Sequence, residues 1–165
     1  VSFTSRFSRI SLKGNHAELG EPPGTLPTVG TNLTDIVVHK IKIIVRELGG
    51  CMGPIWPSYY RDCCSVIFMV DAANTTQVSS SCIQLLSVLS AEALETTSVL
   101  ILFHKYFVLC TFSDIPCPMS LVEMKSLFRL DDIICARQPI TVLGISARNG
   151  QGLQDVQKWL HSIQK

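Results

Sequence analysis

A carboxylate followed by two glycines, Glu47-Leu48-Gly49-Gly50, is the stretch of this sequence best suited to binding chemistry. It comes directly after residues 41–45, an apolar and β-branched run with the composition of a buried strand. Glycine lacks the Cβ atom that would keep a backbone away from a phosphate, so such a strand end can bring its N–H groups to an anion. The same residues also fit an ordinary glycine turn, because short motifs often occur by chance.

Three further polar groups each follow directly after a predicted apolar strand. They are Asp71, His104-Lys105 and Ser146-Ala147. Ligands of open parallel sheets bind beyond the carboxyl ends of the strands. The shared placement of these groups with residues 47–51 therefore favours a phosphate site over an isolated turn.

The elements that position these groups alternate between strands and helices. Amphipathic helices are predicted at 77–94, after the capping box Ser120-Leu121-Val122-Glu123, and after Gly152. Apolar strands that alternate with such helices indicate an α/β domain with a mostly parallel sheet flanked by helices. The strands are predicted at 34–38 and 41–45, joined as a hairpin by His39-Lys40, and at 65–70, 98–103 and 141–145.

The composition narrows the class of protein. A chain of 165 residues fits one domain with a real core, and although 47% of the residues are hydrophobic, no apolar run has the length of a membrane span. A net charge of +1 argues against a broad nucleic-acid surface. The seven cysteines form no CxxC, and the four histidines have no zinc-finger spacing. An odd cysteine count without a disulfide pattern favours a reducing, cytoplasmic setting.

The main domain is expected to span residues 27–165. Residues 1–26 are rich in Ser, Arg, Gly and Pro, and they include the break Glu21-Pro22-Pro23-Gly24, so they predict a poorly ordered segment. Their basic residues come before any acid, as in a transit peptide. The sequence begins with Val1 and not with Met, however, and we expect a fragment or an alternative start.

Three motifs, in order on the expected elements, resemble those of the ADP-ribosylation factor (Arf) family of small GTPases. Pro27-Thr28-Val29-Gly30-Thr31-Asn32 is similar to the first switch segment of that family. Glu47-Leu48-Gly49-Gly50, followed by Pro54-x-Trp56-x-x-Tyr59, is similar to the second switch. Ile145-Ser146-Ala147-Arg148-x-Gly150-x-Gly152-Leu153 is similar to the guanine-contacting loop. The resemblance covers about residues 19–165 and implies the P-loop small-GTPase fold, with a GTP/GDP switch that acts in intracellular membrane traffic.

The resemblance also implies roles for individual residues. Thr28 would give its hydroxyl to Mg²⁺ and its backbone to the γ-phosphate, Glu47 would bond a Mg²⁺-bound water, and Gly50 would donate a backbone N–H to the γ-phosphate. GTP or GDP with Mg²⁺ would be the cofactors. Effector and regulator proteins would bind the two switches, with peripheral association to endomembranes and no nucleic-acid partner. The guanine would contact Lys105, Asp114, Ser146 and Ala147, and the partner face would comprise Val29, Gly30, Asn32, Trp56 and Tyr59.

The sequence departs from the family pattern at three points. The sequence lacks the family's first strand and the G-x-x-x-x-G-K-[ST] loop that follows it. In the family this loop supplies backbone N–H groups that surround the phosphates, a lysine and a Mg²⁺ ligand. Residues 3–12 would have to replace the strand. An apolar insert at 106–112 separates His104-Lys105 from Asp114. Cys51 stands where the family has the glutamine that orients the attacking water. Nucleotide binding and hydrolysis are therefore expected to be impaired.

Other interpretations of the sequence stay open. The chain could be a GTPase-derived module that has lost its nucleotide and binds proteins through aromatic side chains such as Trp56, Tyr59 and Tyr60. It could also be a truncated or mis-spliced variant without a stable function. A redox role for Cys63-Cys64 is a further alternative, although adjacent cysteines are more often small buried residues.

Overall fold

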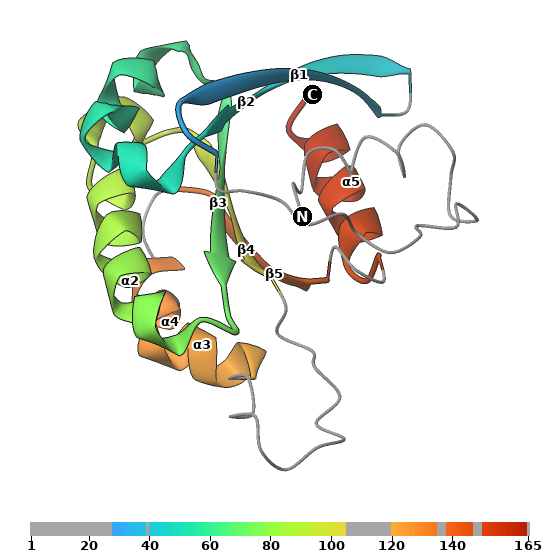
Figure 1. Ribbon diagram of the computed structural model, residues 1–165. Coiled ribbons are helices and arrows are strands. Elements are labelled where there is room, and N and C mark those ends of the chain that lie inside the picture. Colours follow the sequence, from blue (N-terminus) through green and yellow to red (C-terminus); the bar gives the residue numbers. More distant parts are fainter. Residues whose placement is uncertain (1–27, 39, 105–119, 135–137, 147–149, 165) are drawn as a thin grey trace. The chain divides into compact units, whose positions relative to one another are not determined.

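A computed structural model describes residues 28–38, 40–104, 120–134, 138–146 and 150–164 (Figure 1). The chain divides into two compact units. The hairpin unit comprises Val1–Ser58 with Ala147–Lys165, and the sheet unit comprises Tyr59–Ser146. We describe the two units separately.

The hairpin unit is built on two antiparallel strands, β1 (Thr31–Val38) and β2 (Ile41–Leu48). Side chains alternate between the two faces of a strand, and accordingly Ile36 and Val38 are buried while Val37 between them is exposed. The helix α5 (Leu153–Ser162) contacts β1 and buries four side chains, namely Leu153, Val156, Trp159 and Leu160. The apolar face of the hairpin therefore forms a core with the last helix.

A 3-10 helix, η1 (Gly50–Asp62), follows the hairpin and is kinked at Met52. It contains Pro54 and Pro57, and none of its residues is fully buried. Proline has no N–H to donate inside a regular α-helix, which explains why this segment has a tighter and irregular form.

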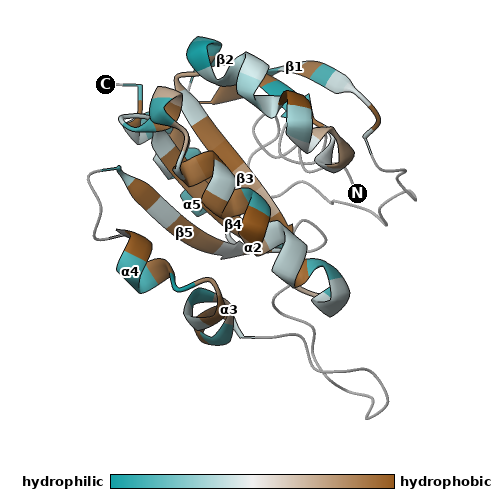
Figure 2. Ribbon diagram, turned by 90° about the vertical axis from the view of Figure 1, so that its left-hand side faces the viewer, coloured by the Kyte–Doolittle hydropathy of each residue, from teal (hydrophilic) through white to brown (hydrophobic). Residues whose placement is uncertain are grey.

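The sheet unit contains three parallel strands in the order β3-β4-β5, which are β3 (Ser65–Asp71), β4 (Ser98–His104) and β5 (Ile140–Ile145). The central strand is the most apolar, and its residues from Val99 to Phe103 are 0% exposed. Figure 2 shows the hydrophobic colouring concentrated on these strands. A strand buried on both faces is the expected form for the middle of a parallel sheet.

The crossovers between these strands carry the helices of the sheet unit. They are α2 (Thr75–Leu89) and η2 (Glu92–Leu94) between β3 and β4, and α3 (Leu121–Leu127) and α4 (Leu130–Ile134) between β4 and β5. Right-handed crossovers between consecutive neighbouring strands place the helices on one face of the sheet. On this face the ring of Phe128 meets the ring of Phe103 edge-on, with 5.4 Å between centroids.

The buried side chain of Gln138 fastens the start of β5 to the turn before β4. Its Nε2 donates hydrogen bonds to the carbonyl oxygens of Leu94 at 2.6 Å and Thr97 at 3.2 Å. Buried polar groups are stable only when they find such partners. This contact connects segments that lie far apart in the sequence.

The predicted fold class is confirmed: the chain has a small-GTPase-like α/β fold with a parallel sheet flanked by helices. Among the described residues the strands form two separate sheets, and residues 3–12, which were expected to replace the family's first strand, lie outside the described residues. The prediction of one helix over 77–94 was wrong at its end. The helix stops at Leu89 because Ala91 is extended, and Leu94 belongs to a separate turn.

The predicted capping box is present at the start of α3. The Ser120 N–H donates to Glu123 Oε2 at 2.7 Å, and the Glu123 N–H donates to Ser120 Oγ at 3.2 Å. The hydrogen bond from the Ser120 backbone holds the pKa of the Glu123 carboxyl below its usual value of 4.5. The side chain at the N-terminus of this helix is therefore bound preferentially as a carboxylate.

This shift predicts a pH dependence of stability. Because the folded-state pKa is lowered, the Glu123 carboxylate stabilises the fold fully above pH 4.5, and that contribution is lost as the pH falls through the lower, folded-state pKa. Urea unfolding of the wild type and of Glu123→Gln should give a stability difference that shrinks over this acidic range. A difference that stays constant on acidification would contradict the assignment.

Candidate functional site

The two residues predicted to serve the metal, Thr28 and Glu47, meet directly in the hairpin unit. The Thr28 hydroxyl donates a hydrogen bond to Glu47 Oε1 at 2.6 Å, and both residues are half-buried. Antiparallel pairing explains this contact between residues that are distant in sequence, because Asn32 lies opposite Glu47 and Thr28 precedes β1. The length is typical of a strong hydrogen bond from a hydroxyl to a carboxylate.

Gly49 brings the second switch against the first. Its N–H donates to the Gly30 carbonyl oxygen at 3.0 Å, which extends the hairpin ladder beyond the Thr31–Leu48 pair. A Cβ atom on Gly49 would lie far inside contact distance of the Thr28 carbonyl oxygen, so only glycine fits. Sequence analysis assigned a role to Gly50 and missed this one, although the double glycine was the signal.

The remaining predicted switch residues lie around this contact. The indole N–H of the half-buried Trp56 donates to the Gly49 carbonyl oxygen at 3.2 Å and holds η1 against the end of β2. Gly50 is exposed, with open space where a Cβ atom would lie. Val29 is 89% exposed and Asn32 is exposed too. Tyr59 is half-buried in η1.

The two glycines allow a matched prediction. Gly49→Ala should lower the free energy of unfolding by about 1–3 kcal/mol, because the added methyl group has to displace the backbone at Thr28. Gly50→Ala, one residue further, should change it by less than about 0.5 kcal/mol, since its new methyl group meets nothing. Urea denaturation measures both values. Equal losses in the two variants would contradict the close approach at Gly49.

The carboxyl edge of the parallel sheet gathers the polar groups predicted there for the sheet unit. Asp71 lies opposite His104, and His104 lies opposite Ile145, which Ser146 follows. Ser146 is only 6% exposed. Asp71 shapes the turn into α2, because its Oδ1 accepts from the Ala73 N–H at 3.1 Å. The other predicted guanine contacts, Lys105, Asp114 and Ala147, lie outside the described residues.

The cysteines near the second switch differ in environment. Cys51, which the sequence analysis places where the family has its water-orienting glutamine, is exposed. Burial raises the pKa of the Cys63 thiol, which donates to the Tyr60 carbonyl oxygen at 3.2 Å. Burial also raises the pKa of the Tyr60 hydroxyl. A protonated, hydrogen-bonded thiol is a poor nucleophile, which describes Cys63, whereas Cys64 beside it is exposed.

The contact between Thr28 and Glu47 is compatible with the metal role that the family implies. The Thr28 hydroxyl donates its hydrogen to Glu47 Oε1 at 2.6 Å and keeps its oxygen lone pairs, through which it would bind Mg²⁺, while Glu47 would bind a water molecule of the ion. In the part of the chain that the structure describes, no group of three or more His, Cys, Asp or Glu side chains could hold a metal ion.

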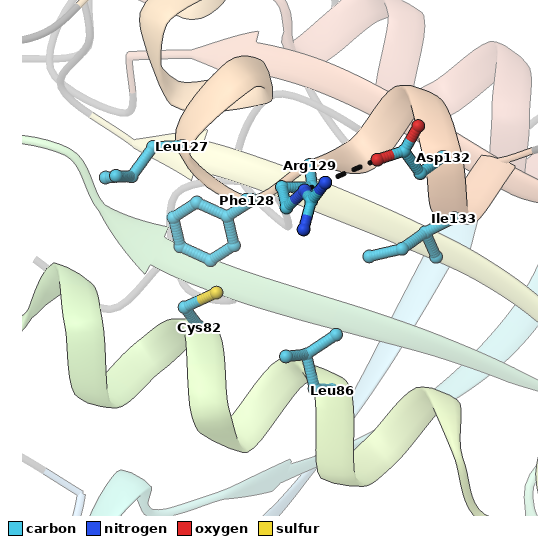
Figure 3. Close-up of a pocket in the computed structure, with 7 residues that line it drawn as sticks. All are labelled: Cys82, Leu86, Leu127, Phe128, Arg129, Asp132 and Ile133. Atoms are coloured by element: carbon cyan, nitrogen blue, oxygen red, sulfur yellow. Dashed lines mark ion pairs between the residues drawn. The ribbon is translucent and has the colours of Figure 1, made fainter.

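A separate hollow lies in the sheet unit, between α2 and the α3–α4 turn (Figure 3). Its volume is about 410 Å³. The exposed side chains of Arg129 and Asp132 pair at its edge, with 3.4 Å between Nε and Oδ2. None of the predicted site residues lines it. The lining is mainly apolar and consists of Cys82, Leu86, Leu127, Phe128, Arg129, Asp132 and Ile133.

Comparison with known proteins identifies relatives over nearly the whole chain. The model of the ADP-ribosylation factor family matches residues 15–164. Human ADP-ribosylation factor-like protein 16 is 56% identical over 161 residues, which cover 97% of this chain and 78% of that relative. ADP-ribosylation factor-like protein 5 of Dictyostelium discoideum is 30% identical over 146 residues, covering 87% of this chain and 75% of the relative.

The solved structures agree with this result. The Arl6 BBS3 small GTPase from Trypanosoma brucei, with the bound nucleotide analogue GppNp, has a TM-score of 0.74. The match covers 96% of this chain and 88% of that one at 16% identity, so it shows a likeness of fold. In the described part of this chain, no helix has the length and hydropathy needed to cross a bilayer. With a family match that extends over most of its residues, the chain belongs to the ADP-ribosylation factor family of small GTPases.

Proposed function

We propose that this chain is an Arf-like regulator of intracellular membrane traffic that acts through its switch segments, with impaired guanine-nucleotide binding and hydrolysis. One observation carries the proposal. Thr28, Gly49 and Trp56 form a connected switch structure, whereas the sequence contains no phosphate-binding loop. The contacts among these switch residues support a role for the switch segments, and the proposal of weakened phosphate binding concerns the sequence as given.

Guanine nucleotide with Mg²⁺ is the ligand class that the family supports. The Trypanosoma brucei neighbour was solved with the nucleotide analogue GppNp, and a nucleotide of this class is our proposal for any ligand of this chain. Ser146, at the carboxyl edge of the sheet unit, is proposed to contact the base together with Lys105, Asp114 and Ala147. Gly50, whose backbone is exposed, is proposed to donate its N–H to a terminal phosphate.

We propose that the rate of GTP hydrolysis is reduced even more than the affinity for the nucleotide. The attacking water in small GTPases is oriented by an amide side chain, which can donate and accept hydrogen bonds at once. Cys51 offers a thiol, which is a weak donor and a weak acceptor. Cys51 is accessible to solvent, but its thiol cannot orient the attacking water through strong hydrogen bonds.

The proposed site of action is the cytoplasmic surface of endomembranes, where effector and regulator proteins would contact residues 28–33 and 50–60. Val29 and Asn32 support this face, because both are exposed beside the connected switch residues. The alternative is a nucleotide-free interaction module that uses the same face. The other alternative from the sequence analysis is that this chain is a truncated or mis-spliced variant without a stable function.

Thermal melting of the purified full chain, with and without GTP and Mg²⁺, tests the proposal. A ligand that binds only the folded state raises the melting temperature, and the shift grows with ligand concentration relative to Kd. A cooperative melt with a shift only at millimolar nucleotide supports the impaired switch. A cooperative melt with no shift at any concentration favours the nucleotide-free module, and the absence of a cooperative melt favours the non-functional variant.

A further inference from the structure

The helix α2 has an outer face without charge. None of its 15 residues is acidic or basic. The outer face of a helix on a soluble domain normally carries charged side chains. Here Ile83 is 70% exposed, and Leu86 is exposed as well. Residues three positions apart on a helix are neighbours on one face, so these two side chains form a contiguous apolar patch.

The spacing of residues along this face is that of a helix which pairs with another helix. Four exposed residues follow one another at intervals of four, three and four positions, namely Ser79, Ile83, Leu86 and Ser90. Such a spacing keeps one stripe of a helix turned toward its partner. The serines at the two ends are small, and they allow a second helix to approach closely. We call these four residues the α2 seam.

The hollow between α2 and the α3–α4 turn lies beside this seam. In Figure 3 the side chains of Cys82 and Leu86 rise from α2 toward Phe128 and Ile133. A cavity of about 150 Å³ already holds a benzene ring, and the hollow measures about 410 Å³. It therefore has room for an aliphatic side chain from a second helix. One copy of the chain thus presents an exposed apolar side chain, Ile83, and an apolar recess on the same surface.

The charges at the edge of the hollow favour a second copy of the same chain as the partner. Arg129 and Asp132 pair there with 3.4 Å between Nε and Oδ2, and both side chains are exposed. A surface with one cation and one anion is complementary to itself when a two-fold axis brings two copies together. A nucleic acid or an anionic lipid surface would need a group of cations, which α2 does not supply.

We propose that two copies of this chain associate through the α2 seam, with Ile83 of each copy packed against the hollow of the other. The patch is small, so it fits a weak and transient dimer with a Kd in the micromolar range. All of this surface belongs to the sheet unit, and none of the residues proposed for nucleotide or effector binding lies on α2. The dimer would therefore use a surface other than the switch segments.

Sedimentation equilibrium of the purified full chain, at concentrations up to about 0.5 mM, tests the proposal. The mean mass should rise with concentration from one copy to two. Ile83→Lys should raise the Kd of the dimer by at least about tenfold, because it places two ammonium groups in one small interface. Ile44→Lys makes the same substitution on β2, at a side chain that is 67% exposed, and should leave the Kd within about twofold.

A mixture of two variants shows whether the seam meets itself. Ile83→Lys and Ile83→Glu should each dimerise poorly, since like charges repel across the interface. Mixed in equal amounts, they should associate at least about tenfold more tightly than either variant alone, because a carboxylate then lies near an ammonium group. Ile44→Lys mixed with Ile44→Glu is the matched control and should show no such gain.

Three outcomes would overturn the proposal. The first is a wild-type chain that stays monomeric at about 0.5 mM, which would leave the seam to a different protein or to another segment of this chain. The second is an equal loss of association in Ile83→Lys and Ile44→Lys. The third is a mixture of the two Ile83 variants that gains no affinity. Each variant should keep the cooperative urea transition of the wild type, because both positions are exposed.

Discussion

The purified chain is expected to bind GTP and GDP at least about a thousandfold more weakly than a small GTPase with a complete phosphate loop, even in excess Mg²⁺. The missing loop would supply backbone N–H groups, a lysine and a metal ligand. Each hydrogen bond to a charged group contributes about 1.5–3 kcal/mol, so the loss of three such contacts weakens binding by several powers of ten.

Fluorescent GTP and GDP titrations measure this difference. The Trypanosoma brucei Arl6 protein, which binds GppNp in its structure, is the positive reference. Cys51→Gln should not improve the affinity or produce measurable hydrolysis, because the glutamine has no tightly held phosphate to act on. Saturable binding at micromolar or lower concentrations would show that other residues of this chain replace the loop.

Phe103→Ala is expected to have the largest effect on stability, a loss of about 3–5 kcal/mol in the free energy of unfolding. Phe103 is 0% exposed on the central strand β4, and its ring meets the ring of Phe128 edge-on. Native domains are stable by about 5–15 kcal/mol in total, so this variant should be close to unfolding at room temperature. Urea denaturation measures the loss.

Control substitutions show whether the loss of stability in Phe103→Ala comes from the buried volume removed at this position. Phe103→Leu keeps most of the buried volume and should cost less than about 2 kcal/mol. Val122→Ala, at a position that is 76% exposed, should change stability by less than about 0.5 kcal/mol. A double-mutant cycle with Phe128→Ala isolates the ring contact, which is expected to contribute about 0.5–1.5 kcal/mol. A loss below about 1 kcal/mol for Phe103→Ala would show that the core is not centred on β4.

The strands and most helices were predictable because their signals are local. The apolar run that forms β4 ends at a polar residue, and the capping box at Ser120 fixes the start of α3 within a few residues. The end of α2 was not predictable in this way. Helical spacing of apolar residues ends at Leu89, but no Gly or Pro follows to mark the stop before Leu94, and the break depends on the extended backbone at Ala91.

The contacts of the candidate site were not predictable from the sequence. The family resemblance named Thr28 and Glu47 for one metal ion, and the structure places a hydrogen bond between their side chains. That they bond to each other depends on the register of β1 against β2, which no short motif encodes. The same register decides that Gly49, and not Gly50, is the glycine in close contact.

The packing of α5 on β1 has a consequence for synthesis on the ribosome. The sheet unit is continuous in sequence, so its strands can pair without a segment from the other unit. Ile36 and Val38 must wait for a helix that is made about a hundred residues later. Until α5 is made, the apolar side chains of β1 lack the helix that contacts this strand in the folded hairpin unit.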